Sequence, residues 1–111
     1  MNDRPNRIRI RELNDRLRCR HIGGRVVVTA GIDALGPENV LHIIREIAAF
    51  DAFTPDNDPY GEHDCATLTV DGRRIIWKID YYDASLKYAS LDPADPAVTN
   101  RVMTVMLAEE Y

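Results

Sequence analysis

The chain has 111 residues, of which 45% are hydrophobic and 29% charged, and its formal net charge is −4. This length and composition predict a single globular domain over residues 1–111 with a core of its own. No apolar run approaches the roughly 18 residues that a membrane-spanning helix needs, and the charged start predicts no secretory signal, so we expect a cytoplasmic protein without membrane contact.

The charge is divided unevenly along the chain. Residues 1–25 hold eight arginines against three acidic residues, which gives +5, whereas residues 26–111 hold six basic and fifteen acidic residues, which gives −9. Because an acidic body repels phosphate, direct nucleic-acid binding is not expected outside the arginine-rich N-terminal segment. Cys19 and Cys65 lack CxxC spacing and are predicted to be free thiols, although a disulfide between them is also compatible with the sequence.

The first predicted element is a helix over residues 6–19, preceded by a frayed segment, residues 1–5. Ile10, Leu13 and Leu17 share one helical stripe, and the glycines in 21–24 end the helix.

Six arginines surround that stripe and are interleaved with Glu12 and Asp15, which predicts a solvated helix with salt bridges along it. Two alternatives stay open. The arginines could contact phosphates, or the helix could dock on acidic residues of its own body or of a second copy.

Next come a strand and a second helix. The β-branched run 25–30 is apolar on both faces and predicts a central strand. Pro37 suits a first helical turn, and Val40, Ile43 and Ile47 then repeat at helical spacing, so a helix is expected to run from Pro37 to the start of an acidic segment.

A hairpin is predicted over residues 65–81. Asp71-Gly72 is the favoured pair for a type I′ turn, and apolar residues alternate on both sides of it, which places Trp77 and Tyr81 in the core. Residues 86–89 are compatible with a short edge strand.

The chain ends in a predicted helix. Asp95 can cap it and Pro96 can occupy its first position, while Val98, Val102 and Val105 fall on one helical face. Together these elements predict an α+β fold, with a small antiparallel sheet of three or four strands, including the 65–81 hairpin, packed by about three helices.

The segment between the second helix and the hairpin, residues 53–64, is the strongest candidate for a functional site. It contains two prolines, a glycine and no basic residue, so it is predicted to be a loop, which we call the acidic loop. Its ionisable and aromatic residues are candidates for partner binding: Asp56, Asp58, Tyr60, Glu62, His63 and Asp64. Because tyrosines are favoured in interfaces, Tyr82 and Tyr88 join this predicted partner-binding set.

Metal binding is the alternative interpretation of the acidic loop. Aligned to a calcium-binding EF-hand loop, Asp56, Asp58 and Gly61 fill expected positions, but Thr67 stands where a bidentate glutamate is required. We therefore predict no metal and no cofactor, and interpret the loop as a solvated turn whose Asp side chains cap backbone amides.

Catalysis has little support in the sequence. In an extended segment His63 and Cys65 would point to the same side, and a Cys–His pair can lower the pKa of a thiol. The neighbouring carboxylates oppose thiolate formation, so no catalytic residue is predicted.

Three motifs carry a resemblance to a known family: Thr54-Pro-Asp-Asn-Asp-Pro-Tyr-Gly-Glu-His-Asp64, Trp77-Lys-Ile-Asp-Tyr-Tyr-Asp83 and Met106-Leu-Ala-Glu-Glu-Tyr111. On these the chain, from Ile10 to Tyr111, resembles the small proteobacterial domain-of-unknown-function family numbered 3768. The resemblance implies a stand-alone accessory protein, often encoded in mobile genetic elements, and it assigns no activity, cofactor or functional residue.

We therefore predict a non-enzymatic binding or regulatory protein that acts through protein–protein contacts. A subsidiary form is an acidic inhibitor that mimics DNA or opposes a defence system. The rival hypothesis is a metal-dependent hydrolase that uses the acidic loop. A homo-oligomer is compatible with either.

Overall fold

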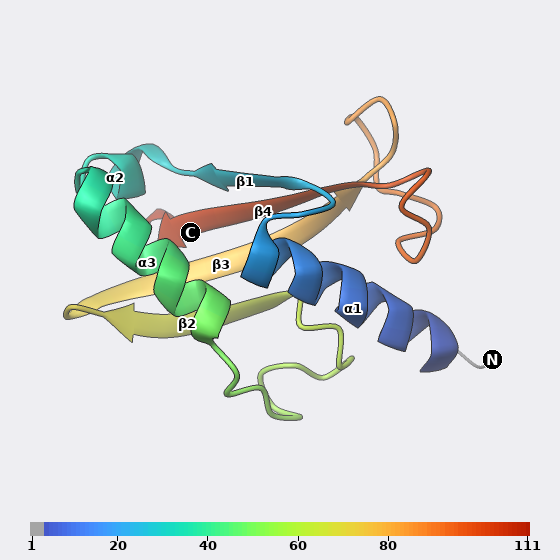
Figure 1. Cartoon of the computed structure of the whole chain (residues 1–111), viewed down its shortest axis with the longest axis horizontal. Coiled ribbons are helices and arrows are strands. Elements are labelled where there is room, and N and C mark those ends of the chain that lie inside the picture. The colour runs from blue at the N-terminus through green and yellow to red at the C-terminus, as the bar shows by residue number, and fades with distance from the viewer. Residues whose placement is uncertain (1–3) are drawn as a thin grey trace.

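The computed structural model describes residues 4–111 and shows an α+β arrangement of two layers (Figure 1). In chain order the elements are α1 (Arg4–Arg20), β1 (Arg25–Val28), α2 (Ala30–Asp33), α3 (Pro37–Ala49), β2 (Cys65–Val70), β3 (Arg73–Tyr82), β4 (Asn100–Leu107) and the 3₁₀ helix η1 (Ala108–Glu110). The strands form one sheet in the order β1-β4-β3-β2, and α1 and α3 lie on the same face of it.

Several predicted elements are confirmed. Helices α1 and α3 match the two predicted helices, and His21 and Gly23 have the positive φ angles of 58° and 85° that end α1. The hairpin of β2 and β3 turns at Asp71 and Gly72, both with positive φ as a type I′ turn requires. Helix α1 begins inside the segment predicted to be frayed, residues 1–5, of which residues 1–3 lie outside the described part.

The core lies between the helices and one sheet face. Trp77 is completely buried, and it packs with Ile75 and Ile79 of the same strand, with Leu17 of α1 and with Ile47 of α3. The prediction that Trp77 and Tyr81 face the core is therefore confirmed, since Tyr81 packs against this cluster as well. Residues that alternate with them along β3 face the other side of the sheet, which neither long helix covers.

The predicted C-terminal helix is wrong, because residues 100–107 form strand β4. This strand pairs antiparallel with β3 and parallel with β1, so the sheet is mixed rather than purely antiparallel. Its β-branched residues suit a strand with neighbours on both sides, and Met103 and Val105 are completely buried. Asp95 caps only a turn, by accepting a hydrogen bond from the amide of Ala97 at 2.8 Å.

Strand β1 is an edge strand, so the prediction of a central strand over residues 25–30 is also wrong. It has only four residues, and Arg25 and Val27 are exposed on its outer side. An apolar β-branched run shows that a segment is a strand, but the pairing partners decide whether both of its edges are occupied. The predicted strand over 86–89 is reduced to one isolated bridge between Ala89 and Tyr82.

Candidate functional site

The acidic loop is a sequence of tight turns that its own side chains hold together. Thr54 and Asn57 cap each other, since the amide of each donates to the side-chain oxygen of the other at 2.8 and 3.2 Å. The amide of Asp58 donates to the carbonyl of Thr54, and the amide of Gly61 to the carbonyl of Asp58. The predicted loop is confirmed, but the capping side chains at this turn are those of Thr54 and Asn57, whereas the prediction named Asp side chains.

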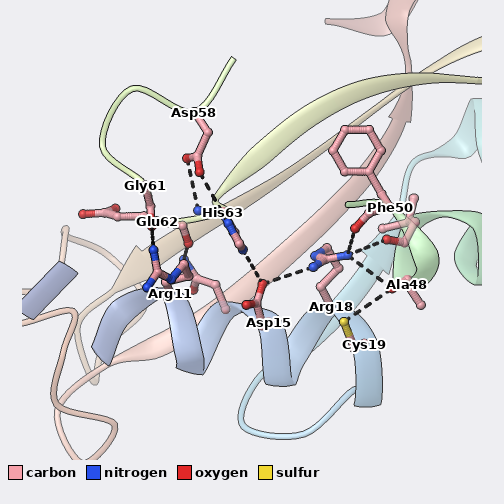
Figure 2. Close-up of polar contacts among 12 residues, drawn as sticks. Arg11, Asp15, Arg18, Cys19, Ala48, Phe50, Asp58, Gly61, Glu62 and His63 are labelled. Atoms are coloured by element: carbon pink, nitrogen blue, oxygen red, sulfur yellow. Dashed lines mark hydrogen bonds and ion pairs between the residues drawn. The ribbon is translucent and has the colours of Figure 1, made fainter. Parts of the chain in front are cut away.

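Helix α1 holds the loop from the other side through three residues on one helical face (Figure 2). Arg11 donates to the carbonyl of Gly61 at 3.5 Å, and the side-chain amide of Asn14 donates to the carbonyl of Glu62 at 3.1 Å. The Asp15 carboxylate lies 2.8 Å from Nδ1 of His63. The spacing of three and four residues brings these side chains onto the same side of the helix.

His63 occupies the centre of this contact. Its ring stacks on Phe53 with the ring centres 3.8 Å apart and the planes 5° from parallel. Asp58, which is only 7% exposed, accepts a hydrogen bond from the His63 amide at 3.1 Å, and its second oxygen lies 3.7 Å from Nε2 of the same ring. The interpretation of Asp58 as part of a solvated turn is therefore wrong.

A buried polar network continues from Asn14 into the sheet. Asn14 is fully buried, donates to the hydroxyl of Tyr81 at 2.8 Å and accepts from Nε of Arg101 at 2.9 Å. The Tyr81 hydroxyl donates to the carboxylate of Glu62 at 3.1 Å, and Arg101 also donates to the carbonyl of Pro93.

Burial governs the protonation of this network. Partial removal from water raises the pKa of Glu62, although the hydrogen bond from Tyr81 opposes that shift. Burial likewise raises the pKa of the Tyr81 hydroxyl, which therefore stays protonated and acts as a donor. Burial lowers the pKa of Arg101, but its neighbours Tyr81 and Glu62 favour the charged guanidinium.

Arg18 fastens α1 to α3 and was not predicted as a buried residue. Its guanidinium donates to the carbonyls of Ile47 and Phe50 at 2.9 and 2.8 Å, where α3 ends, and to Asp15 at 3.1 Å. It also lies over the ring of Trp77. The sequence contained a signal, because position 18 is eight residues after Ile10 and so falls on the apolar face of the helix. The prediction that the arginines of α1 are all solvated is wrong, since Arg18 is buried.

These contacts give the polar side chains of the loop a structural role. His63 has a positive φ of 54°, so the extended geometry that would align it with Cys65 is absent. Cys65 and Cys19 are free and exposed, and burial together with Asp64 raises the pKa of the Cys65 thiol. Within residues 4–111 no group of three or more His, Cys, Asp or Glu side chains is placed to hold a metal ion, so the hydrolase hypothesis gains no site.

The eight predicted partner-binding residues divide into inward and outward groups. His63 contacts α1, Glu62 contacts the buried network and Asp58 contacts His63, whereas Asp56 is exposed and Tyr60 is 62% exposed. Asp64 lines a groove of about 520 Å³ on the open sheet face. Tyr82, the last residue of β3, is half-buried, and Tyr88, in the segment that follows β3, is 71% exposed.

Two loops far apart in sequence meet at one groove. Tyr60 of the acidic loop and Leu91 of the segment 83–99, which connects β3 to β4, line a groove of about 280 Å³ together with Ile10 of α1. Leu91 is 100% exposed and also lines a second groove with Val98. We call Tyr60, Leu91 and Val98 the two-loop surface. Periodicity could not identify it, because none of the three belongs to a helix or strand in the structure.

A model of the family described as protein of unknown function (DUF3768) matches residues 28–110, which include the acidic loop and strands β2 to β4. This confirms the family named above, over residues 28–110 rather than from Ile10 onward. No curated protein and no solved structure matches the chain. Among the described helices, none is long and apolar enough to cross a membrane.

Proposed function

We propose that this chain, which belongs to the family of proteins of unknown function DUF3768, is a protein-binding module that contacts its partner through the two-loop surface. The observation that carries the proposal is Leu91, an apolar side chain fully exposed beside exposed Tyr60 and Val98. Single exposed leucines are common, but several apolar side chains on adjoining grooves mark an interaction site.

The loops behind this surface are pre-organised, which lowers the entropic cost of binding. In the segment 83–99, one oxygen of Asp83 accepts hydrogen bonds from the hydroxyl of Ser85 at 2.7 Å and from its amide at 3.1 Å. Ser90 and Thr99 are joined at 2.7 Å, and Thr99 donates to the carbonyl of Asp92. The acidic loop is held in place by its contacts with α1.

The charge around the surface indicates the kind of partner. Glu62 and Asp92 line the groove of Tyr60 and Leu91, and Asp83 lines the adjoining groove. Arg7 is the one basic residue among those that line these two grooves. An apolar pocket with a basic rim on another protein would complement it. The DNA-mimicking form of the proposal gains less support, because Asp58 is buried beside His63.

The test is affinity capture from the native host with the wild type and with Leu91→Gln. Leu41→Gln is a matched control, since Leu41 is 48% exposed on α3, away from both loops. A protein bound by the wild type and the control, and at least tenfold more weakly by Leu91→Gln when purified, would support the proposal. Equal binding by all three forms would contradict it. The identity of the captured partner would test the accessory role in mobile genetic elements that the family resemblance implies.

A further inference from the structure

Strand β2 leaves one of its edges open. It is the last strand in the order β1-β4-β3-β2, and its other edge pairs with β3. The amide of Ile79 donates to the carbonyl of Asp64 at 2.7 Å, so Asp64 and Ile79 form a hydrogen-bonded pair of the antiparallel ladder. Because such pairs alternate in an antiparallel ladder, the backbone groups of Thr67 and Thr69 point away from β3.

The open edge has none of the usual protections. Strands at sheet edges are normally blunted by a charge, a proline, a bulge or a covering element. The sequence of β2, Cys-Ala-Thr-Leu-Thr-Val, has no charged residue and no proline, and its register with β3 runs without a bulge. The amides and carbonyls of Thr67 and Thr69 point away from β3, and among residues 4–111 no backbone or side-chain group outside the β2–β3 ladder forms a hydrogen bond with them. The other edge strand, β1, is shorter and begins with Arg25.

We infer that the open edge of β2 pairs with β2 of a second copy of this chain. The pairing is antiparallel about a two-fold axis at Leu68, so that Thr67 of each copy faces Thr69 of the other. A two-fold axis makes the interface self-complementary, and Thr–Thr pairs are favourable across antiparallel strands. The two sheets then join into one continuous sheet, and the exposed backbone groups of both copies are satisfied.

Charge at the ends of β2 favours the antiparallel arrangement with an identical partner. Asp64 precedes the strand, and Arg73 and Arg74 follow its turn. Antiparallel pairing of two copies places Asp64 of each strand beside the turn that precedes Arg73 and Arg74 of the other, whereas parallel pairing would place Asp64 beside Asp64. The turn also carries Asp71, whose carboxylate lies 3.5 Å from Nε2 of His42. No charged side chain of β2 itself opposes the contact.

The experiment measures self-association and edge protection in the same samples. Sedimentation equilibrium of the full chain over a concentration series should show a monomer–dimer equilibrium. Amide hydrogen exchange should show that Thr67 and Thr69 become at least tenfold more protected as the dimer forms. The amides of Ala66 and Leu68, which face β3, should be protected at every concentration.

Two variants and a control keep the test decisive. Thr67→Pro removes an outward amide and should give a monomer, since proline is tolerated where an edge amide faces solvent. Thr67→Lys keeps the amide and places two like charges at diagonal positions on one face of the joined sheet, so it should weaken the dimer at least tenfold, and added salt should reverse part of the loss. Thr67→Val should dimerise like the wild type.

A wild-type chain that stays monomeric at every concentration would overturn the inference. So would a dimer that Thr67→Pro and Thr67→Lys leave unchanged, or one whose Thr67 and Thr69 amides remain unprotected. The inference does not rest on the proposed function, because the two-loop surface contains no residue of β2. Leu91→Gln should therefore leave the dimer intact.

Discussion

Nδ1 of His63 and a carboxylate oxygen of Asp15 lie 2.8 Å apart, which joins the acidic loop to α1 across 48 residues of sequence. The same Asp15 oxygen accepts a hydrogen bond from Arg18 at 3.1 Å, and Arg18 in turn binds the end of α3. One carboxylate thus links the loop, the first helix and the third (Figure 2). Its position explains why a loop with two prolines and a glycine has a defined shape.

Replacement of His63 by alanine should destabilise the protein. The change removes the hydrogen bond to Asp15 and the stacking on Phe53, so we expect the free energy of unfolding to fall by about 1–3 kcal/mol. Urea unfolding followed by the fluorescence of Trp77 measures it. His42→Ala is the matched control, because His42 is an exposed histidine paired only at 3.5 and 3.9 Å, and its loss should cost less than about 0.5 kcal/mol. Equal losses for the two variants would show that the loop is not anchored through His63.

Asn14 should be the most sensitive polar residue of α1. Its replacement by alanine leaves the buried Arg101 guanidinium without an acceptor at Nε and removes the donor to Tyr81, so the loss should reach about 3 kcal/mol. Asn39→Ala removes a single bond to the carbonyl of Leu35 and should cost about 1 kcal/mol or less. Thermal and chemical unfolding of the two variants provide the comparison, and a smaller loss at Asn14 would contradict the network.

The hairpin faces can be tested at Trp77. Because this side chain is completely buried, Trp77→Ala should cost about 3–5 kcal/mol, whereas Trp77→Phe should cost clearly less, since the indole nitrogen has no hydrogen-bond partner to lose. Trp77 is the only tryptophan, so circular dichroism must follow the unfolding. A loss below about 1 kcal/mol for the alanine variant would mean that this side chain does not face the core.

Stability should depend on pH through Glu62. Burial raises the folded-state pKa of this carboxyl above its ordinary value of 4.5, so its stabilising protonation is complete below pH 4.5 and is lost as the pH rises through the folded pKa. Glu62→Gln is neutral at every pH and can still accept from Tyr81. The variant should therefore exceed the wild type in stability at neutral pH, and the difference should shrink toward pH 4.5. Glu109→Gln, at an exposed position, is the control for the change of residue type.

Some elements of the fold are determined by residues close together in the sequence, and others by the strands that pair with them. The type I′ turn at Asp71-Gly72, the C-terminal end of α1 and the start of α3 at Pro37 depend on residues within a few positions of each other, and all three were predicted correctly. The terminal strand was predicted as a helix, because Val98, Val102 and Val105 fit a helical period. Only the positions of β1 and β3, which take up both edges of residues 100–107, favour the strand.

The candidate site follows the same division. By itself the sequence determined that residues 53–64 form a polar loop between a helix and a hairpin, because proline, glycine and turn-forming side chains act on the adjacent backbone. Which side chains of that loop face outward was decided by tertiary structure alone. His63 turns inward because Asp15 of α1 supplies its partner, Glu62 because Tyr81 of β3 does, and Asp58 because it contacts His63. Leu91 meets Tyr60 because the sheet brings their two loops to one groove. Contacts between residues this far apart depend on the packing of whole elements, which no local pattern records.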